Sequence, residues 1–87
     1  MDDLGAHDDE LPSELLPLVE PLAAEVHAAW ARAKRAQGFT LGEPEGGRMR
    51  HPDLVDWDIL PEETKDLDRA TVRAVLIGVW RRGYRAP

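Results

Sequence analysis

The sequence predicts a small, mainly all-α domain in which two long helices pack together and are joined by a long Gly/Pro-rich loop and a short helix. Three observations predict this fold. Apolar residues recur with the helical period in two separate stretches, a glycine follows each stretch, and a segment rich in glycine and proline (38–53) lies between them. The length of 87 residues is sufficient for one domain only.

The first long helix is expected to begin near Leu18. Proline lacks an N–H and its ring clashes with the preceding turn, so Pro17 is expected before the helix and Pro21 within its first turn. The apolar stripe that follows has spacings of three and four residues and consists of Leu22, Val26, Ala29, Trp30 and Ala33. Gly38 is expected to end this helix in a left-handed conformation.

The second half of the chain is expected to form a short helix followed by the second long one. Pro61 and the two glutamates after it are typical of a helix start, since carboxylates favour the positive end of the helix dipole. Asp68 is typical of an N-cap and is expected to begin the second long helix. The second apolar stripe consists of Val72, Val75, Leu76, Val79 and Trp80. Gly83 is expected to stop the helix.

Charge is distributed unevenly along the chain, whose net charge is −6. Residues 1–25 carry eight acidic and no basic side chains, whereas residues 26–87 carry nine acidic and eleven basic ones. We therefore expect a flexible acidic arm over residues 1–12 and a single folded domain over residues 13–87. Because the domain is only mildly basic, general nucleic-acid binding is not expected, although a local anion site is compatible with this charge.

Composition argues against most kinds of catalytic or metal site. The chain has no cysteine, which excludes disulfides, thiolate zinc sites and thiol nucleophiles, and its only serine is Ser13. The carboxylates between Asp53 and Asp66 lack the spacing of an EF-hand. We expect a protein that is not an enzyme and needs neither metal nor cofactor. With no signal-peptide pattern and no apolar run of ~18 residues, it is expected to be cytoplasmic and not bound to membrane.

Aromatic and basic side chains gather at the end of the first helix and in the loop after it. An aromatic face stacks on a flat heterocycle, and Arg or Lys beside it holds phosphate, so this combination is typical of a site for a nucleotide-like ligand. The candidate ligand-binding residues are Trp30, Arg32, Lys34, Phe39, Arg50, His51 and Trp57.

Each aromatic residue of this set also has a structural interpretation. Trp30 lies on the apolar stripe of the first helix, so its ring is either part of the core or faces a ligand. Trp57 lies between two aspartates and either packs or contacts a ligand or partner, whereas Phe39 is expected mainly in the core. His27 is expected to fix the loop to the helix, with Glu63 or Asp66 as candidate partners.

Three segments, taken in order, resemble the RyR domain, the helical repeat named after ryanodine receptors and also found as a short module in bacteria and phages. The segments are HAAWARAKRAQGFTLG (27–42), RHPDLVDWDILPEETK (50–65) and RRGYRAP (81–87). The resemblance covers roughly residues 15–86 and implies a helical fold without enzymatic activity. This chain departs from the family pattern at Phe39, where tryptophan is usual, and at Leu41, where a larger residue is usual.

The resemblance also implies a kind of function. Bacterial copies look like sensor or recognition parts, in several cases beside nucleotide-based defence systems, and ryanodine receptors carry the repeats in pairs whose helix tryptophans lie near a cleft. Trp30 occupies the matching position. We therefore expect a sensor or sponge for a nucleotide or nucleotide-derived signal that acts as a homodimer. The alternative is a protein-interaction module that docks a partner through its acidic arm or a helix surface.

Overall fold

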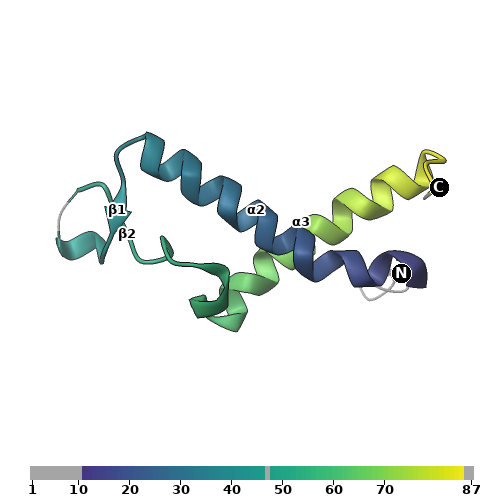
Figure 1. Cartoon of the computed structure of the whole chain (residues 1–87), viewed down its shortest axis with the longest axis horizontal. Helices are drawn as coiled ribbons and strands as arrows, with labels where there is room; N and C mark the ends of the chain where they lie inside the picture. Colours follow the sequence, from purple (N-terminus) through teal and green to yellow (C-terminus); the bar gives the residue numbers. More distant parts are fainter. Residues whose placement is uncertain (1–10, 47, 86–87) are drawn as a thin grey trace, which may run out of the picture.

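The computed structural model describes residues 11–46 and 48–85 and is mainly helical, as the sequence predicts. Two long helices cross near their middles, and the loop that joins them lies to one side of the crossing (Figure 1). In chain order the elements are η1 (Ser13–Leu15), α2 (Leu16–Ala36), β1 (Thr40–Leu41), η2 (Pro44–Gly46), β2 (Arg50–His51), η3 (Trp57–Ile59) and α3 (Glu62–Arg81). Among the described residues, neither long helix contains an apolar stretch of the length that a bilayer span needs.

Helix α2 begins earlier than the sequence predicts. It starts at Leu16, directly after the 3-10 turn η1, so that Pro17 lies within the helix and Pro21 in its second turn. Pro17 costs no helical hydrogen bond because N–H groups of a first turn have no partner in any case. Pro21 gives up only the bond to the carbonyl of Pro17, and the alanine-rich sequence after it favours a helix strongly enough to continue. The prediction that the helix begins near Leu18 is therefore wrong by about half a turn.

Both long helices end as predicted, at a glycine in the left-handed region. Gly38 has φ of 101° and Gly83 has φ of 92°. After α2, the N–H of Gly38 donates to the carbonyl of Arg35 and the N–H of Phe39 to that of Lys34, which is the Schellman arrangement. The same pair of bonds follows α3. These turns fix the direction in which the loop leaves α2.

Helix α3 is continuous, and the predicted break at Asp68 is wrong. Pro61 precedes the helix with an extended backbone, and Glu62 is its first residue. The expected short helix is therefore the first turn of α3, and Asp68 lies inside the same helix. No proline or glycine occurs between Glu62 and Gly78, so nothing interrupts the backbone there. The short helical turn before α3 is η3 instead.

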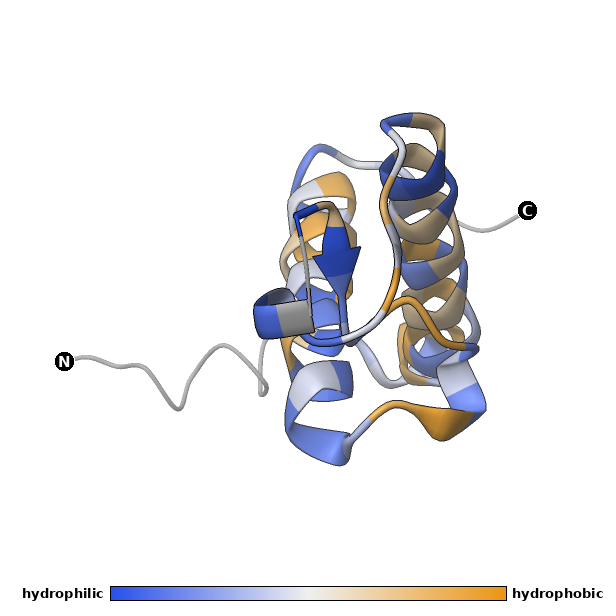
Figure 2. Cartoon of the chain, turned by 90° about the vertical axis from the view of Figure 1, so that its left-hand side faces the viewer, coloured by the Kyte–Doolittle hydropathy of each residue, from blue (hydrophilic) through white to orange (hydrophobic). Residues whose placement is uncertain are grey.

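The loop contains a two-residue parallel strand pair. Thr40 of β1 pairs with Arg50 of β2, and Leu41 pairs with His51. Between them the chain makes a tight crossover that ends at Met49, whose φ of 63° lies in the left-handed region. Figure 2 views the molecule from the side of the loop and shows β2, coloured blue for its hydrophilic residues, in front of the helices. The pairing holds His51 at the end of the loop that returns to α2.

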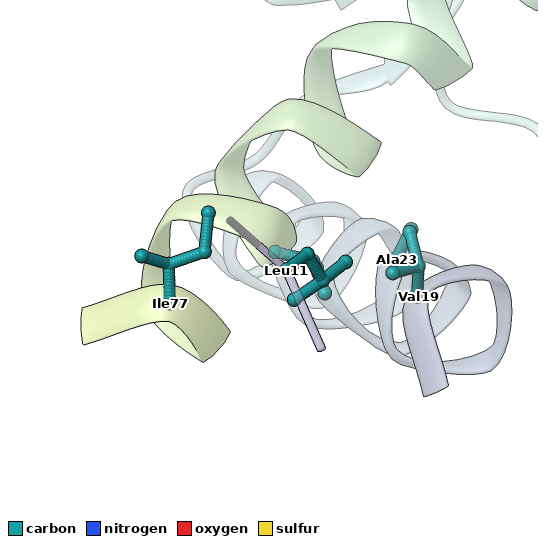
Figure 3. Packing of buried hydrophobic residues seen from close by; sticks show 5 residues of the cluster. Leu11, Val19, Ala23 and Ile77 are labelled. Carbon is teal, nitrogen blue, oxygen red and sulfur yellow. The ribbon is translucent and has the colours of Figure 1, made fainter. Parts of the chain in front are cut away.

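The core lies where the helices cross. Val19 and Ala23 of α2 and Val72 and Ile77 of α3 belong to one buried cluster, in which Ala23 has no exposed surface. Leu11 completes this cluster and lies between Ile77 and the α2 residues (Figure 3). Leu11 was expected in the flexible arm, but it is 5% exposed and therefore belongs to the core. The remainder of the predicted arm, residues 1–10, lies outside the described residues.

The face of α2 that packs on α3 is not the predicted stripe. The buried residues are Val19, Ala23, His27 and Ala31, each four positions after the last. Val19 and Ala23 pack on α3, whereas His27 and Ala31 lie beside the loop at Val55. The small side chain of Ala23 lets the helices approach closely, which leaves the bulkier residues of the predicted stripe beside the contact. Val26, Ala29 and Ala33 are exposed, and Leu22 and Trp30 are half-buried. On α3, the predicted stripe is split in the same way, since Val72 is buried but Val75 and Val79 are exposed.

Candidate functional site

His27 joins the loop to α2 and is the central residue of the candidate site. Its side chain is 5% exposed, and its Nε2 lies 2.6 Å from the carbonyl oxygen of Val55. Since a carbonyl oxygen accepts, Nε2 must donate this hydrogen bond. The sequence correctly predicts that His27 fixes the loop, but neither of the candidate partners Glu63 and Asp66 receives the bond.

Aromatic rings form a row on both sides of His27. Its ring stacks on Trp30 with centroids 5.6 Å apart and lies 6.3 Å from the ring of Trp57. On the outer side of Trp30, the ring of His51 meets it edge-on at 4.8 Å. The row therefore runs through Trp57, His27, Trp30 and His51, and it brings residues from α2, β2 and η3 together. Aromatic pairs at these distances stabilise the arrangement beyond the area they bury.

Two hollows of similar size open on opposite ends of this row, and His27 forms a wall of each. The first is about 210 Å³ and lies between α2 and the start of η3, beside Trp57. The second is about 200 Å³ and lies between α2, β2 and the start of α3, beside Trp30. We call them the Trp57 hollow and the Trp30 hollow.

The two hollows differ in charge. The Trp57 hollow is lined by Arg32, Arg35 and Asp56, and by alanines of α2 that give it a flat floor. The Trp30 hollow is lined by Asp53 and Asp68, with no lysine or arginine among its described lining residues. The first hollow is therefore suited to an anion, whereas the second repels one and favours groups that donate hydrogen bonds.

The predicted ligand-binding residues do not share one cavity. Arg32 and Trp57 line the Trp57 hollow, whereas Trp30 and His51 line the Trp30 hollow. The other three line neither. The Nζ of Lys34 lies 4.7 Å from the centroid of the Phe39 ring, and the side chain of Arg50 runs along the loop beside Gly42. The expected combination of Trp30 with Arg32 and Lys34 in a single concavity is not observed.

A group of charged side chains that are not among the candidate site residues lies beside the ring of Trp57. Arg69 binds both carboxylate oxygens of Glu20 at 2.8 Å and also donates to Glu62 at 3.0 Å and Asp66 at 2.8 Å. Its guanidinium lies 5.6 Å from the centroid of the Trp57 ring. The bonds to Glu20 join α2 to α3 across 49 positions in the sequence.

Lys65 belongs to the same group. It is buried in spite of its charge, with its Nζ 5.3 Å from the Trp57 ring and 3.4 Å from a carboxylate oxygen of Glu62. Lys65 and Arg69 are four positions apart and therefore share one face of α3. The acidic and basic residues from Glu62 onwards are spaced three and four positions apart, which is typical of one helix face. The predicted helix break at Asp68 divided this pattern in two.

Acid is expected to weaken the contact between the helices. Hydrogen bonds from Arg69 lower the pKa of Glu20 and of Glu62 below the ordinary value of 4.5. A carboxyl group with a lowered pKa stabilises the fold above its unfolded pKa, and this stabilisation is lost as the pH falls through the folded pKa. The melting temperature should therefore fall below about pH 4.5.

The matched variants for this prediction are Arg69→Met and Arg48→Met. Arg69→Met should flatten the dependence of the melting temperature on pH, because both carboxyl groups then lose the largest cause of their lowered pKa. Arg48 is exposed in the loop and has no role in the group, so Arg48→Met should keep the wild-type slope. Both carboxylates are exposed, so added salt should also reduce the slope. Equal slopes for the wild type and Arg69→Met would contradict this account.

Among the described residues, no group of three or more histidines, aspartates or glutamates is arranged to hold a metal ion. The model of the RyR domain family matches residues 5–86. This range includes both long helices, the loop and every residue that lines the two hollows.

Proposed function

The chain belongs to the RyR domain family, and from this premise we propose that it is a non-enzymatic binding module for a nucleotide or nucleotide-derived signalling molecule, acting as a homodimer. The observation that supports this best is the lining of the Trp57 hollow. There an indole, two guanidinium groups and a flat floor of alanines border one cavity. The Trp30 hollow lacks this combination, because no lysine or arginine is among its described lining residues.

The Trp57 hollow has the chemistry that a nucleotide needs. A base resting on the alanine floor is positioned to stack on the indole, and this kind of contact is worth ~1–3 kcal/mol per base. Arg32 and Arg35 are exposed and available for charge-assisted hydrogen bonds to phosphate. A volume of about 210 Å³ is below the ~300–1,000 Å³ typical of sites that enclose a drug-sized ligand. The hollow would hold the base, with the sugar and phosphates lying outward along the arginines.

The Trp30 hollow suits a different part of a ligand. Its carboxylates, Asp53 and Asp68, disfavour phosphate but accept hydrogen bonds from amino groups. A ligand part bound against Trp30 would therefore be neutral or positively charged. Variants in the two hollows can consequently tell which tryptophan a nucleotide uses.

A thermal-shift screen against purine nucleotides, cyclic nucleotides, dinucleotides and ADP-ribose derivatives tests the proposal. A ligand at 100 times its Kd should add about 2.7 kcal/mol to the free energy of unfolding, which is readily seen as a rise in melting temperature. Arg32→Gln should weaken binding by ~1–3 kcal/mol, the range for a charged hydrogen bond. The matched control is Arg48→Gln, in an exposed loop arginine outside both hollows.

The tryptophan variants then locate the ligand. Trp57→Ala should abolish the shift, while Trp30→Ala should leave most of it. The reverse result, with Arg32→Gln unaffected, would place the ligand in the Trp30 hollow and refute the assignment made here. A blank screen with a well-folded protein would reject nucleotide binding.

The second candidate function is a protein-interaction module. It is favoured by the exposed apolar side chains that α2 and α3 share on one side of their crossing, because contiguous exposed apolar surface commonly marks a binding face. The alternative route, through the acidic arm, involves residues 1–10, which lie outside the described residues.

A further inference from the structure

An apolar groove runs between α2 and α3 on the side of the crossing away from η3. Its wider part has a volume of about 340 Å³, and apolar side chains dominate its lining: Leu22, Val26, Ala29, Val72, Val75 and Leu76. Beyond Leu76 the groove continues into a second hollow of about 200 Å³, beside Val79 and Tyr84. We call both parts together the helix groove.

The side chains of the helix groove are poorly covered by the chain itself. Val75 is 59% exposed, Val79 43% and Tyr84 68%. In the interior, no large side chain of the described residues is fully buried, so the core alone offers little apolar contact. A domain this small buries a low fraction of its apolar surface alone, so covering this groove adds stabilisation that the fold otherwise lacks. The regular apolar spacing on both helices is thus better matched to an external contact than to the internal one.

The charges at the ends of the helix groove indicate which partner fits. Glu25 lines the wide end. Arg85 lines the narrow end, and Arg82 follows Val79 by about one helical turn and so shares its face of α3. Among the described residues, the hydrogen bonds of both arginines go to backbone carbonyls, and the guanidinium of Arg85 also lies 3.6 Å from the centroid of the Trp80 ring. In these contacts their charge is not neutralised by a carboxylate. The groove is therefore acidic at one end and basic at the other.

We propose that a second copy of this chain docks in the helix groove, antiparallel and about a two-fold axis. A two-fold axis brings the same patch of both copies together in opposite directions. The Glu25 end of each copy then meets the arginine end of the other, and the exposed valines cover one another. Trp30 lies one turn after Val26 on α2, so the Trp30 hollow is close to the edge of this interface. The helix groove is then the interface of the proposed homodimer, and this interface does not depend on the proposed ligand.

Sedimentation velocity on the full chain, over a range of concentrations up to about 1 mM, tests the interface. The wild type should sediment as a dimer that dissociates on dilution. Val75→Asp should raise the dimer Kd at least about tenfold, because it places a carboxylate in the middle of the apolar contact. Ala74→Asp is the matched control, since Ala74 is exposed on the same helix but lies outside the groove. Both variants should keep the helical circular dichroism of the wild type.

A charge exchange distinguishes a second copy from any other occupant. Glu25→Arg and Arg82→Glu should each weaken the dimer, and the double variant should restore it, because only self-association joins these two ends. A wild type that is monomeric at all concentrations would overturn the proposal, as would a dimer that Val75→Asp leaves unchanged. Repeating the nucleotide screen on Val75→Asp separates the two proposals. A dimeric wild type with a blank screen rejects the ligand and keeps the interface, whereas nucleotide binding by a wild type that is monomeric at all concentrations rejects the interface and keeps the ligand.

Discussion

Ala23→Asp is expected to unfold the protein. Ala23 has no exposed surface and lies where α2 crosses α3, in the same cluster as Val72. An aspartate there has no described basic partner within the cluster, so its charge would be buried without compensation, which costs several kcal/mol even after the surroundings relax. The larger side chain would also push the helices apart. Small domains have a total stability of only about 5–15 kcal/mol, so a loss of this size removes most of it.

Circular dichroism during thermal and urea unfolding measures this loss. Ala28→Asp is the control, because Ala28 is exposed on the same helix and a surface substitution normally changes stability by only about ±0.5 kcal/mol. If Ala23→Asp melted cooperatively at the wild-type temperature, the helix crossing described here would be incorrect.

His27→Ala is expected to destabilise the protein by about 2–4 kcal/mol. The substitution leaves the half-buried carbonyl of Val55 without its donor, a loss of about 1–3 kcal/mol, and opens a cavity between Trp30 and Trp57. Because His27 forms a wall of both hollows, both should lose their shape. Tryptophan fluorescence should report this directly, with emission shifted towards that of solvent-exposed indole.

Two further variants separate the contributions of His27. His27→Gln keeps a side-chain N–H donor without the ring and should recover part of the loss. His51→Ala removes a half-buried ring at the end of the row and should cost less than His27→Ala. A free energy of unfolding for His51→Ala that falls further than that for His27→Ala would reverse the roles assigned to the two histidines.

The parts of the fold that local chemistry determines were predictable from the sequence. The two long helices follow from the period of their apolar residues, and their ends follow from Gly38 and Gly83, which adopt a backbone conformation that other residues rarely reach. The role of His27 in holding the loop was also predictable. The start of α2 was not, because two prolines in its first turns suggested a later beginning.

The choice of buried face could not be read from the sequence. Apolar periodicity favoured the stripe of Leu22 and Val26, but the helices approach through Ala23, where small size matters more than hydrophobicity. The stripe is nonetheless regular, as expected if it serves a contact outside the chain. Periodicity alone reports that a face is apolar and does not say what covers it.

The arrangement of the candidate site residues could not be predicted from the sequence. Trp30 and Arg32 are two positions apart, so on a helix their side chains point in widely different directions. The structure accordingly places them in different hollows. Arg69 was missed as a partner of Glu20 because their contact joins distant parts of the chain. Arg69 lies beside the Trp57 ring because of the angle at which the two helices cross. No local sequence pattern encodes that angle.

The attachment of the loop has a consequence for motion. Between Gly42 and Pro61, the loop is held to the rest of the fold by the hydrogen bond of Val55 to His27, by the buried side chains of Leu54 and Leu60, and by the rings of His51 and Trp57. Of these loop residues, Trp57 packs against the buried cluster at the helix crossing, whereas Val55, Leu54 and Leu60 lie outside that cluster. The loop can therefore open as a cooperative unit at a lower free energy than global unfolding, while the helices stay packed. The amide hydrogens of the loop are expected to exchange through this partial opening. The same opening limits how long the loop residues remain in place as walls of the two hollows.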